Sequence, residues 1–336
     1  AAYKHIQPKL SRAKAEMLFG KNKSYSITSL EKYNSCPFSY YLEKGLYAAP
    51  AKTGRIEKSH LGSLIHAAVC DYCAIVEDSA QSPEQIRNKW EQLTPELSSH
   101  IIADIMSDIK EKVTKKSGES KQIEYMLSRC AATLRKSADN IRKSIISGGY
   151  ISVCREKDFE IQIDWKDRKV KLFGTIDRID IMEDAVENKA KIRVIDYKSG
   201  YKKFSLTAIC NRLDMQLVLY ALAAAKMYET GMLYNHGPLY KPQISGIFYN
   251  RLIDDFVEIP KNDEALAQKE QLKSRRLDGM IVLDEENGNL ISDEICDMDS
   301  AFQENKSSEF LNVSLKTDNT LTKASQVTSR STFNTV

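Results

Sequence analysis

Several features that identify common classes of protein are missing from this sequence of 336 residues. It has no run of about 18 apolar residues, and its amino end lacks the apolar segment of a signal peptide. Its seven cysteines are an odd set without the spacing of a disulfide framework. We therefore expect a cytoplasmic protein with no membrane segment.

The motifs of three enzyme classes are also absent. Without a Gly-x-x-x-x-Gly-Lys-Ser/Thr phosphate loop, any ATP-driven motor must belong to another region or subunit. Without a Gly-x-Gly-x-x-Gly turn or a Gly-x-Ser-x-Gly elbow, nicotinamide chemistry and ester hydrolysis are excluded. The net charge of +3 is weak evidence for a polyanionic partner.

The hydrophobic periodicity predicts a protein of helices and strands with a helical insertion before the main strands. Helical patterns cover 59–77, 83–147 with breaks near 94 and 117, and 207–228, whereas strand patterns cover 151–165, 170–181, 192–197 and 243–250. We also expect a strand at 256–259 and a helix at 263–276. The expected parts are an N-terminal lead-in with a Cys-Pro-Phe helical segment (1–58), a histidine helix with a helical subdomain (59–150), a core (151–260) and a C-terminal helix with strands (261–336).

Two runs of the expected sheet carry the chemistry: Gly174-Thr-Ile-Asp-Arg-Ile-Asp180 and Ile195-Asp-Tyr-Lys-Ser-Gly200. Alternation along a strand places Asp196 and Lys198 on one face and Tyr197 on the other. Antiparallel pairing of the two runs can bring Asp177 opposite Asp196. Two carboxylates and an amine would then meet at a strand end.

Paired carboxylates suit a hard cation such as Mg²⁺, which takes its other ligands from water and phosphate oxygens. A lysine beside them can help to ionise a water or stabilise charge on a phosphate. The pattern favours phosphodiester hydrolysis because of its context, although for a lone Asp-x-Lys a solvated strand end would be the better explanation. Lys202 and Lys203 follow directly, where a phosphate backbone would have to pass.

These two runs, followed by Gln216-Leu-Val-Leu-Tyr220 and preceded by a helix with Gly62-Ser-Leu-Ile-His66, resemble the RecB-type branch of the PD-(D/E)xK nucleases. The segment from Ser26 to Tyr40, with its Cys36-Pro-Phe, is similar to the nuclease domains of the AddB family in bacterial AddAB helicase-nucleases. The resemblance covers nearly the whole chain and implies an α/β fold with a mixed central sheet flanked by helices and with a helical insertion.

The resemblance implies a DNA exonuclease domain that uses Mg²⁺ or Mn²⁺ and cuts an unwound, single strand beside an AddA-type helicase subunit. The implied metal ligands are His66, Asp177, Asp196 and the Tyr197 carbonyl. Lys198 would position or activate the water, and Gln216 and Tyr220 would set the lysine and the strand. Glu156 and Glu160 offer further acidic contacts near the site, although exposed glutamates are common on strands.

Cys36 matches the first of four iron-sulfur ligands in the same resemblance, which implies a 4Fe-4S cluster in a full-length parent. No cysteine follows Cys296, so we expect the chain to be truncated before the remaining ligands. We then expect Cys36 by itself to be a buried thiol without a cluster, because such clusters need four thiolates.

Alternative interpretations stay open at this point. His66, Cys70 and Cys73 fall at helical spacing, which would suit zinc, but a fourth ligand is not evident and core cysteines fit better. The chain can also be a DNA-binding module that keeps the nuclease fold without catalysis. A third alternative is another RecB-type enzyme, such as a CRISPR-associated single-strand exonuclease.

Overall fold

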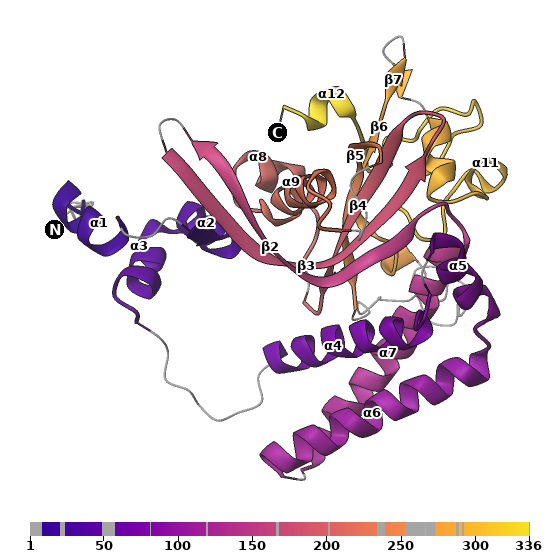
Figure 1. Cartoon of the computed structure of the whole chain (residues 1–336), viewed down its shortest axis with the longest axis horizontal. Helices are drawn as coiled ribbons and strands as arrows, with labels where there is room; N and C mark the ends of the chain where they lie inside the picture. The colour runs from indigo at the N-terminus through magenta and orange to yellow at the C-terminus, as the bar shows by residue number, and fades with distance from the viewer. Residues whose placement is uncertain are drawn as a thin grey trace.

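A seven-stranded mixed sheet with helices on both faces organises the protein, as the computed structural model shows (Figure 1). The structure describes residues 9–20, 24–48, 58–80, 82–118, 120–165, 168–200, 202–233, 239–252, 266, 273–286, 289–290 and 292–335. The predicted α/β class with a mixed, helix-flanked sheet is confirmed. The strand expected at 256–259 and most of the helix expected at 263–276 lie outside the described residues.

The strands follow the order β1-β3-β4-β5-β6-β9, and β2 pairs with β3. Their bounds are β1 (Ser24–Ser26), β2 (Ile151–Trp165), β3 (Arg168–Asp184), β4 (Lys189–Lys198), β5 (Lys241–Arg251), β6 (Asp278–Leu283) and β9 (Val327–Ser329), with a separate pair β7 (Glu285–Glu286) and β8 (Asn289–Leu290). The pairs β2–β3, β3–β4 and β5–β6 are antiparallel, whereas β1–β3, β4–β5 and β6–β9 are parallel. The connection between β3 and β4 is shorter than predicted, because both strands extend further toward each other.

In the described chain, one group of helices precedes β2, two helices lie between β4 and β5, and the remaining short helices follow β8. Their bounds are α1 (Arg12–Phe19), α2 (Ile27–Ser35), α3 (Pro37–Tyr40), η1 (Tyr41–Gly45), α4 (Lys58–Val76), α5 (Pro83–Gln92), α6 (Pro95–Ser117), α7 (Lys121–Ile146), α8 (Leu206–Cys210), α9 (Gln216–Glu229), η2 (Ser292–Asp297), α11 (Phe302–Asn305) and α12 (Arg330–Phe333). The helical insertion is confirmed. Ser82, Thr94 and Ser120 cap its helices by accepting a backbone N–H three residues on, in agreement with the breaks in the sequence. No described helix combines the length and the apolar composition needed to cross a bilayer.

Two hydrophobic cores lie on the two sides of the sheet. One contains Ile195 and Tyr197 of β4 together with the apolar faces of α4, α6 and α7. The other contains Ile192 and Val194 of β4 together with the buried face of α9. In Figure 1 the long helices α4, α6 and α7 accordingly lie on one side of the strands, and α8 and α9 lie on the other. The alternation predicted for this strand is confirmed.

The single helix predicted over 207–228 is wrong, because the chain forms two helices separated by a turn. Arg212 adopts a left-handed conformation (φ 61°), and the N–H of Leu213 bonds to the carbonyl of Ala208. This pattern ends α8 as a Schellman motif, which usually has glycine at the left-handed position. An arginine there conceals the helix end in the sequence. Leu213 therefore lies outside α9 and does not share its face with Gln216 and Tyr220.

The run Thr28-Ser-Leu-Glu31 matches the capping-box pattern and predicts a helix that begins near Ser29, but α2 begins at Ile27. The cap is Ser26, whose Oγ accepts the N–H of Ser29 at 3.2 Å. Glu31 instead reaches another helix, the start of α9. The local pattern was correct about a helix in this segment but wrong about its first residue.

Candidate active site

Three acidic residues come from three neighbouring strands at one point of the sheet. The β2–β3 pairs Arg155–Arg178 and Lys157–Ile176 leave Glu156 facing Asp177. The β3–β4 ladder ends at Arg178–Ile195, so Asp177 and Asp196 are the next residues beyond its last pair. The sheet therefore brings together the two predicted aspartates and adds Glu156.

The regular alternation of β3 is interrupted at this point. Ile176 and Ile179 belong to the same hydrophobic core, although strict alternation would place them on opposite faces. Glu156, across from this irregularity, has a left-handed backbone (φ 47°), which is uncommon for a residue other than glycine. This irregularity lets the carboxylate of Asp177 reach His66 of α4.

β3 also lacks a partner strand on one edge beside Asp177. Its residues 171–173 pair with β1 and its residues 178–184 pair with β4, while residues 174–177 pair with neither of these strands. The N–H of Tyr197 fills part of this interval by donating to Oδ2 of Asp177 at 2.7 Å. A backbone group of β4 thus fixes the direction of the Asp177 carboxylate.

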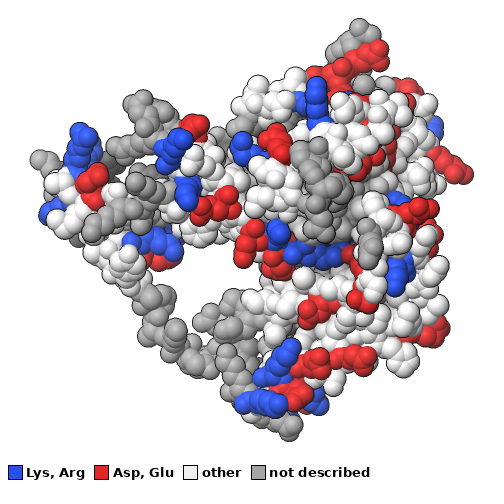
Figure 2. Space-filling model, in the orientation of Figure 1, with Lys and Arg blue, Asp and Glu red and all other residues white. Residues whose placement is uncertain are grey.

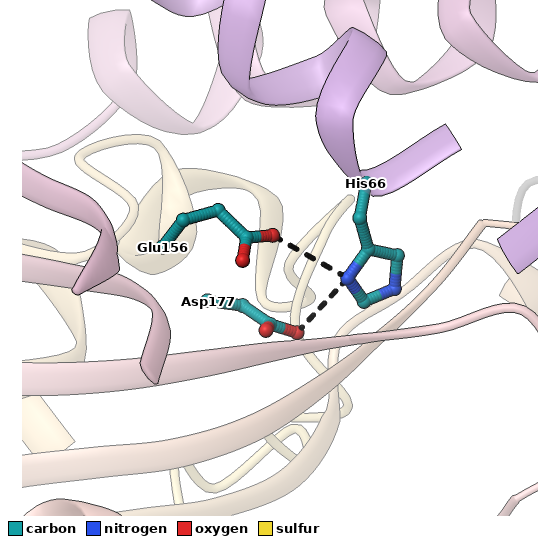
Figure 3. A group of neighbouring side chains, drawn as sticks. All are labelled: His66, Glu156 and Asp177. Atoms are coloured by element: carbon teal, nitrogen blue, oxygen red, sulfur yellow. Dashed lines mark ion pairs between the residues drawn. The ribbon is translucent and has the colours of Figure 1, made fainter. Parts of the chain in front are cut away.

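Helix α4 contributes His66 to the acidic group, as Figure 3 shows. Its Nδ1 lies 3.6 Å from Oδ2 of Asp177 and 3.7 Å from Oε1 of Glu156. The ring also meets the ring of Tyr197 edge-on, with centroids 5.8 Å apart. His66, Glu156 and Asp177 each offer one ligand atom, and these atoms lie within 4.8 Å of one another.

Gly62 explains the spacing of the Gly-x-x-x-His motif. A Cβ built on Gly62 would lie 2.5 Å from Oγ of Ser199, the residue that follows Lys198. Only a residue without a side chain lets α4 approach the end of β4 this closely. Because His66 lies one helical turn further along α4, this approach brings its imidazole to Asp177.

The pKa values of the site report an excess of negative charge. Burial, followed by the charge of Asp196, raises the pKa of Asp177 to about 7. Burial also raises the pKa of Asp196, although the adjacent Lys198 opposes it. Burial lowers the pKa of His66, but the hydrogen bond with Glu156 and the charge of Asp177 outweigh burial, and the net pKa is raised. A bound cation would relieve this repulsion.

Lys198 lies where the sequence pattern predicted, next to Asp196 and on the α9 side of the sheet. Its Nζ forms an ion pair with Oδ2 of Asp196 and donates to Oε1 of Gln216 at 3.0 Å. Nε2 of Gln216 in turn donates to the hydroxyl of Tyr220 at 2.9 Å. The structure thus connects Asp196, Lys198, Gln216 and Tyr220 in one hydrogen-bonded chain.

A second group beside this chain was not recognised from the sequence. Asp214 accepts from the hydroxyl of Tyr249 at 2.6 Å and forms an ion pair with Lys202 at 2.9 Å. The ammonium groups of Lys198 and Lys202 lie 5.4 Å and 4.8 Å from the centroid of the Tyr249 ring. Lys202, expected to meet a phosphate backbone, is therefore partly neutralised by Asp214. The sequence offered no signal for the contact of Asp214 with Tyr249, because the two residues are 35 positions apart in the chain.

A buried ionic network supports the strands beneath the site. Arg178 contacts Asp180 through Nε and Nη2 at 2.6 and 2.8 Å, and Nε of Arg193 contacts the same carboxylate at 2.8 Å. Burial alone would raise the pKa of Asp180, but the two guanidinium groups lower it below its usual value. Nη2 of Arg193 also donates to Ser144 of α7 at 2.8 Å. The network ties β3 and β4 to the helical layer next to the acidic group.

Cys36 lies apart from these contacts. It separates α2 from α3, and its Sγ accepts the N–H of Ser39 at 3.4 Å. The expectation of a buried thiol is wrong, because the side chain of Cys36 is exposed at the junction of two short helices. Within the described ranges, the only group of three or more possible metal ligands is His66, Glu156 and Asp177, so no described cysteine belongs to one. Cys73 is fully buried, and burial raises its pKa to about 11. The zinc alternative for His66, Cys70 and Cys73 therefore gains no support.

Charged side chains of both signs are mixed on one face of the molecule (Figure 2). On the face shown in Figure 2, Lys and Arg side chains alternate with Asp and Glu side chains, and one basic group lies near the centre. This agrees with the small net charge of +3.

Comparisons with known proteins agree with this geometry. A family model described as the PD-(D/E)XK nuclease superfamily matches residues 24–298. A protein of Ruminiclostridium cellulolyticum, named as a subunit of an ATP-dependent helicase/deoxyribonuclease, is 27% identical over 292 residues, which are 84% of this chain and 24% of the relative. Proteins of the same name from Thermoanaerobacter pseudethanolicus and Clostridium perfringens are 30% identical over 287 residues and 29% identical over 296 residues, covering 82% and 84% of this chain and 23% and 24% of the relatives. The chain thus spans about a quarter of the length of the curated relatives it matches.

Proposed function

Because the chain belongs to the PD-(D/E)XK nuclease superfamily, we propose that it is the metal-dependent DNA exonuclease domain of an ATP-dependent helicase-nuclease. The substrate would be one strand of unwound DNA, and the process would be double-strand-break repair and recombination. The relatives' shared name, which makes each of them part of an ATP-dependent helicase/deoxyribonuclease, supports the enzyme class and its association with a helicase. The observation that carries the proposal is the convergence of His66, Glu156 and Asp177 within 4.8 Å.

The donor set fits a divalent cation. Carboxylate oxygens are the preferred ligands of Mg²⁺ and Mn²⁺, and burial together with the charge of Asp196 raises the pKa of Asp177, so a cation beside it would favour its ionised form. We propose that His66, Asp177, Asp196 and the Tyr197 carbonyl hold the ion, with Glu156 as a further ligand. When bound, Mg²⁺ would neutralise charge on the phosphate and lower the pKa of a coordinated water.

Lys198 would act on the attacking water or the reacting phosphate. An ammonium group has three N–H donors, and Asp196 and Gln216 use two of them. The third can donate to a water or phosphate oxygen held near Asp196. Because Gln216 accepts from Lys198 and donates to Tyr220, this pair would hold the amine in place during the reaction.

The proposed partners are supported by the relatives' shared name, which makes each relative a subunit of an ATP-dependent helicase/deoxyribonuclease. We propose that an AddA-type helicase-nuclease subunit works beside this domain and delivers single-stranded DNA to the site. Cys36, exposed at the start of α3, would be one ligand of a 4Fe-4S cluster in a longer parent protein. Its exposure leaves the thiolate accessible to partners from another segment.

The decisive test is Asp196→Ala, measured with end-labelled single-stranded DNA in the presence of Mg²⁺. We expect cleavage to fall by more than about 100-fold because a metal ligand and the partner of Lys198 are both lost. Calorimetric titration with Mn²⁺ should show weaker binding as well. The matched control is Asp164→Ala, which removes an exposed carboxylate from the far part of β2 and should change neither measurement. Cleavage by Asp196→Ala equal to that of the wild type would refute the assignment.

A further inference from the structure

Glu31 of α2 contacts the beginning of α9 although the two residues are far apart in the chain. Its Oε1 accepts the N–H of Met215 at 2.7 Å and the N–H of Gln216 at 2.8 Å. The sequence pattern predicts a local capping role for this glutamate within α2, but Ser26 fills that role. The carboxylate of Glu31 instead accepts the N–H of Gln216, 185 residues further along the chain.

The amino end of α9 lacks a capping side chain of its own. The first N–H groups of any helix lack partners within it, and the helix dipole favours negative charge at this end. Met215, at the N-cap position of α9, has no oxygen in its side chain and makes no capping hydrogen bond. Glu31 therefore supplies from another element the acceptor that the N-cap residue cannot provide.

A second contact holds the same turn. Nδ2 of Asn34, one turn after Glu31 on α2, donates to the carbonyl of Arg212 at 3.1 Å. The segment between α8 and α9 is thus held by α2 at both ends. Because Arg212 has a left-handed backbone, this turn has an unusual conformation that external contacts help to maintain.

Gln216 is both the first residue of α9 and the residue that bonds to Lys198 and Tyr220. We propose that Glu31 is a positioning residue of the nuclease site, which sets the place of Lys198 by fixing the backbone of Gln216. This inference rests on the proposed function. The negative charge of Glu31 is also close enough to contribute to the raised pKa of Tyr220, after burial and the charges of Asp196 and Asp177.

The test is a double-mutant cycle between Glu31→Ala and Gln216→Ala. We expect Glu31→Ala to lower turnover about tenfold, since small displacements of positioning groups cost this much or more, and to leave Mn²⁺ affinity unchanged. In the Gln216→Ala background the same change should cost little, because the route from Glu31 to Lys198 is already broken. Glu31→Gln keeps an acceptor oxygen and should restore most of the turnover.

The matched control is Glu43→Ala in η1, a neighbouring glutamate that pairs with Lys32 and Lys44 and makes no contact with α9 among the described residues. It should leave turnover unchanged. Hydrogen exchange at the Met215 and Gln216 amides gives a readout without substrate or metal, and both should exchange faster in Glu31→Ala.

Fully additive losses in the cycle, or unchanged amide exchange, would overturn the positioning role while leaving the nuclease assignment intact. Retained cleavage in Asp196→Ala would instead overturn the nuclease assignment. The two failures are therefore distinguishable in one set of variants.

Discussion

The backbone N–H of Tyr197 donates to Oδ2 of Asp177 at 2.7 Å, at the place where the regular pairing of β3 with β4 stops. This bond continues the contact between the strands that carry Asp177 and Asp196 beyond the last pair of their ladder. Because the donor is a backbone N–H, no substitution of a side chain on β4 removes this hydrogen bond directly. In an extended residue the N–H and the C=O point to the same side, so the Tyr197 carbonyl faces the same edge as Asp177.

Lys198→Ala should reduce turnover far more than metal affinity. The amine contacts Asp196 and Gln216, and its loss removes a donor near the reacting phosphate without removing an oxygen ligand. We expect turnover to fall about 100-fold and the Mn²⁺ dissociation constant to change by less than about threefold. Cleavage assays and calorimetry measure the two effects separately. An equal loss of both would mean that Lys198 acts by organising the ligands.

Glu156→Gln should weaken metal binding, although a strand glutamate is an ordinary surface residue in the sequence pattern. Its carboxylate lies 3.7 Å from Nδ1 of His66 and faces Asp177 across the strands. An amide keeps the size but loses the charge, so we expect Mn²⁺ affinity to fall about tenfold. Glu160→Gln, four residues further along β2 and paired with Lys171 on an exposed edge, is the control. Equal affinities in the two variants would exclude Glu156 from the ligand set.

Gly62→Ala should displace α4 from the end of β4. The new methyl group would lie 2.5 Å from Oγ and 3.2 Å from Cβ of Ser199, and moving the helix would carry His66 away from Asp177. We expect about a tenfold loss of Mn²⁺ affinity by calorimetry, because a ligand held by a displaced helix binds poorly. Ser199→Gly in the same chain removes both contacting atoms and should restore most of the affinity. Failure of this rescue would show that Gly62 matters for another reason.

Asp177→Asn should stabilise the metal-free protein at alkaline pH. The pKa of Asp177 is about 7 in the folded chain and about 3.9 in an unfolded one, so folding favours its protonated form. The stability that this group contributes is present below pH 4 and is lost as the pH rises through 7. The asparagine variant lacks this loss and should exceed the wild type by about 1–3 kcal/mol above pH 7, with a smaller difference near pH 4. Urea unfolding with a metal chelator present, at several pH values, measures the difference, and a pH-independent one would contradict the prediction.

Many of the central strands and insertion helices could be predicted from the sequence, because the patterns that indicate them are local. Period-two alternation identified β2, β3 and β4, and the spacing of Asp196 and Lys198 placed them together on the side of the sheet that α9 covers. Serine, threonine and proline marked the ends of the insertion helices. Each of these signals depends on residues within a few positions of one another.

Other features had no local signal. The end of α8 has arginine where glycine would mark a left-handed turn, so one long helix was the natural prediction. Glu156 reaches the site through an irregular backbone, which strand alternation does not describe. Glu31 has a plausible partner within its own helix, yet its actual partners lie near residue 215.

The amino-acid sequence by itself predicted the strands β2 to β5 but not β1, β6 or β9, and it determined which residues on those strands are acidic or basic and which superfamily their order resembles. Only the tertiary structure decided that His66, Glu156 and Asp177 share one point and that Glu31 holds the helix carrying Gln216. The physical reason is that side-chain alternation and helix period are set by neighbouring residues. Contacts between distant segments depend on the twist and irregularities of the sheet and on how closely a helix can pack, as Gly62 allows against Ser199.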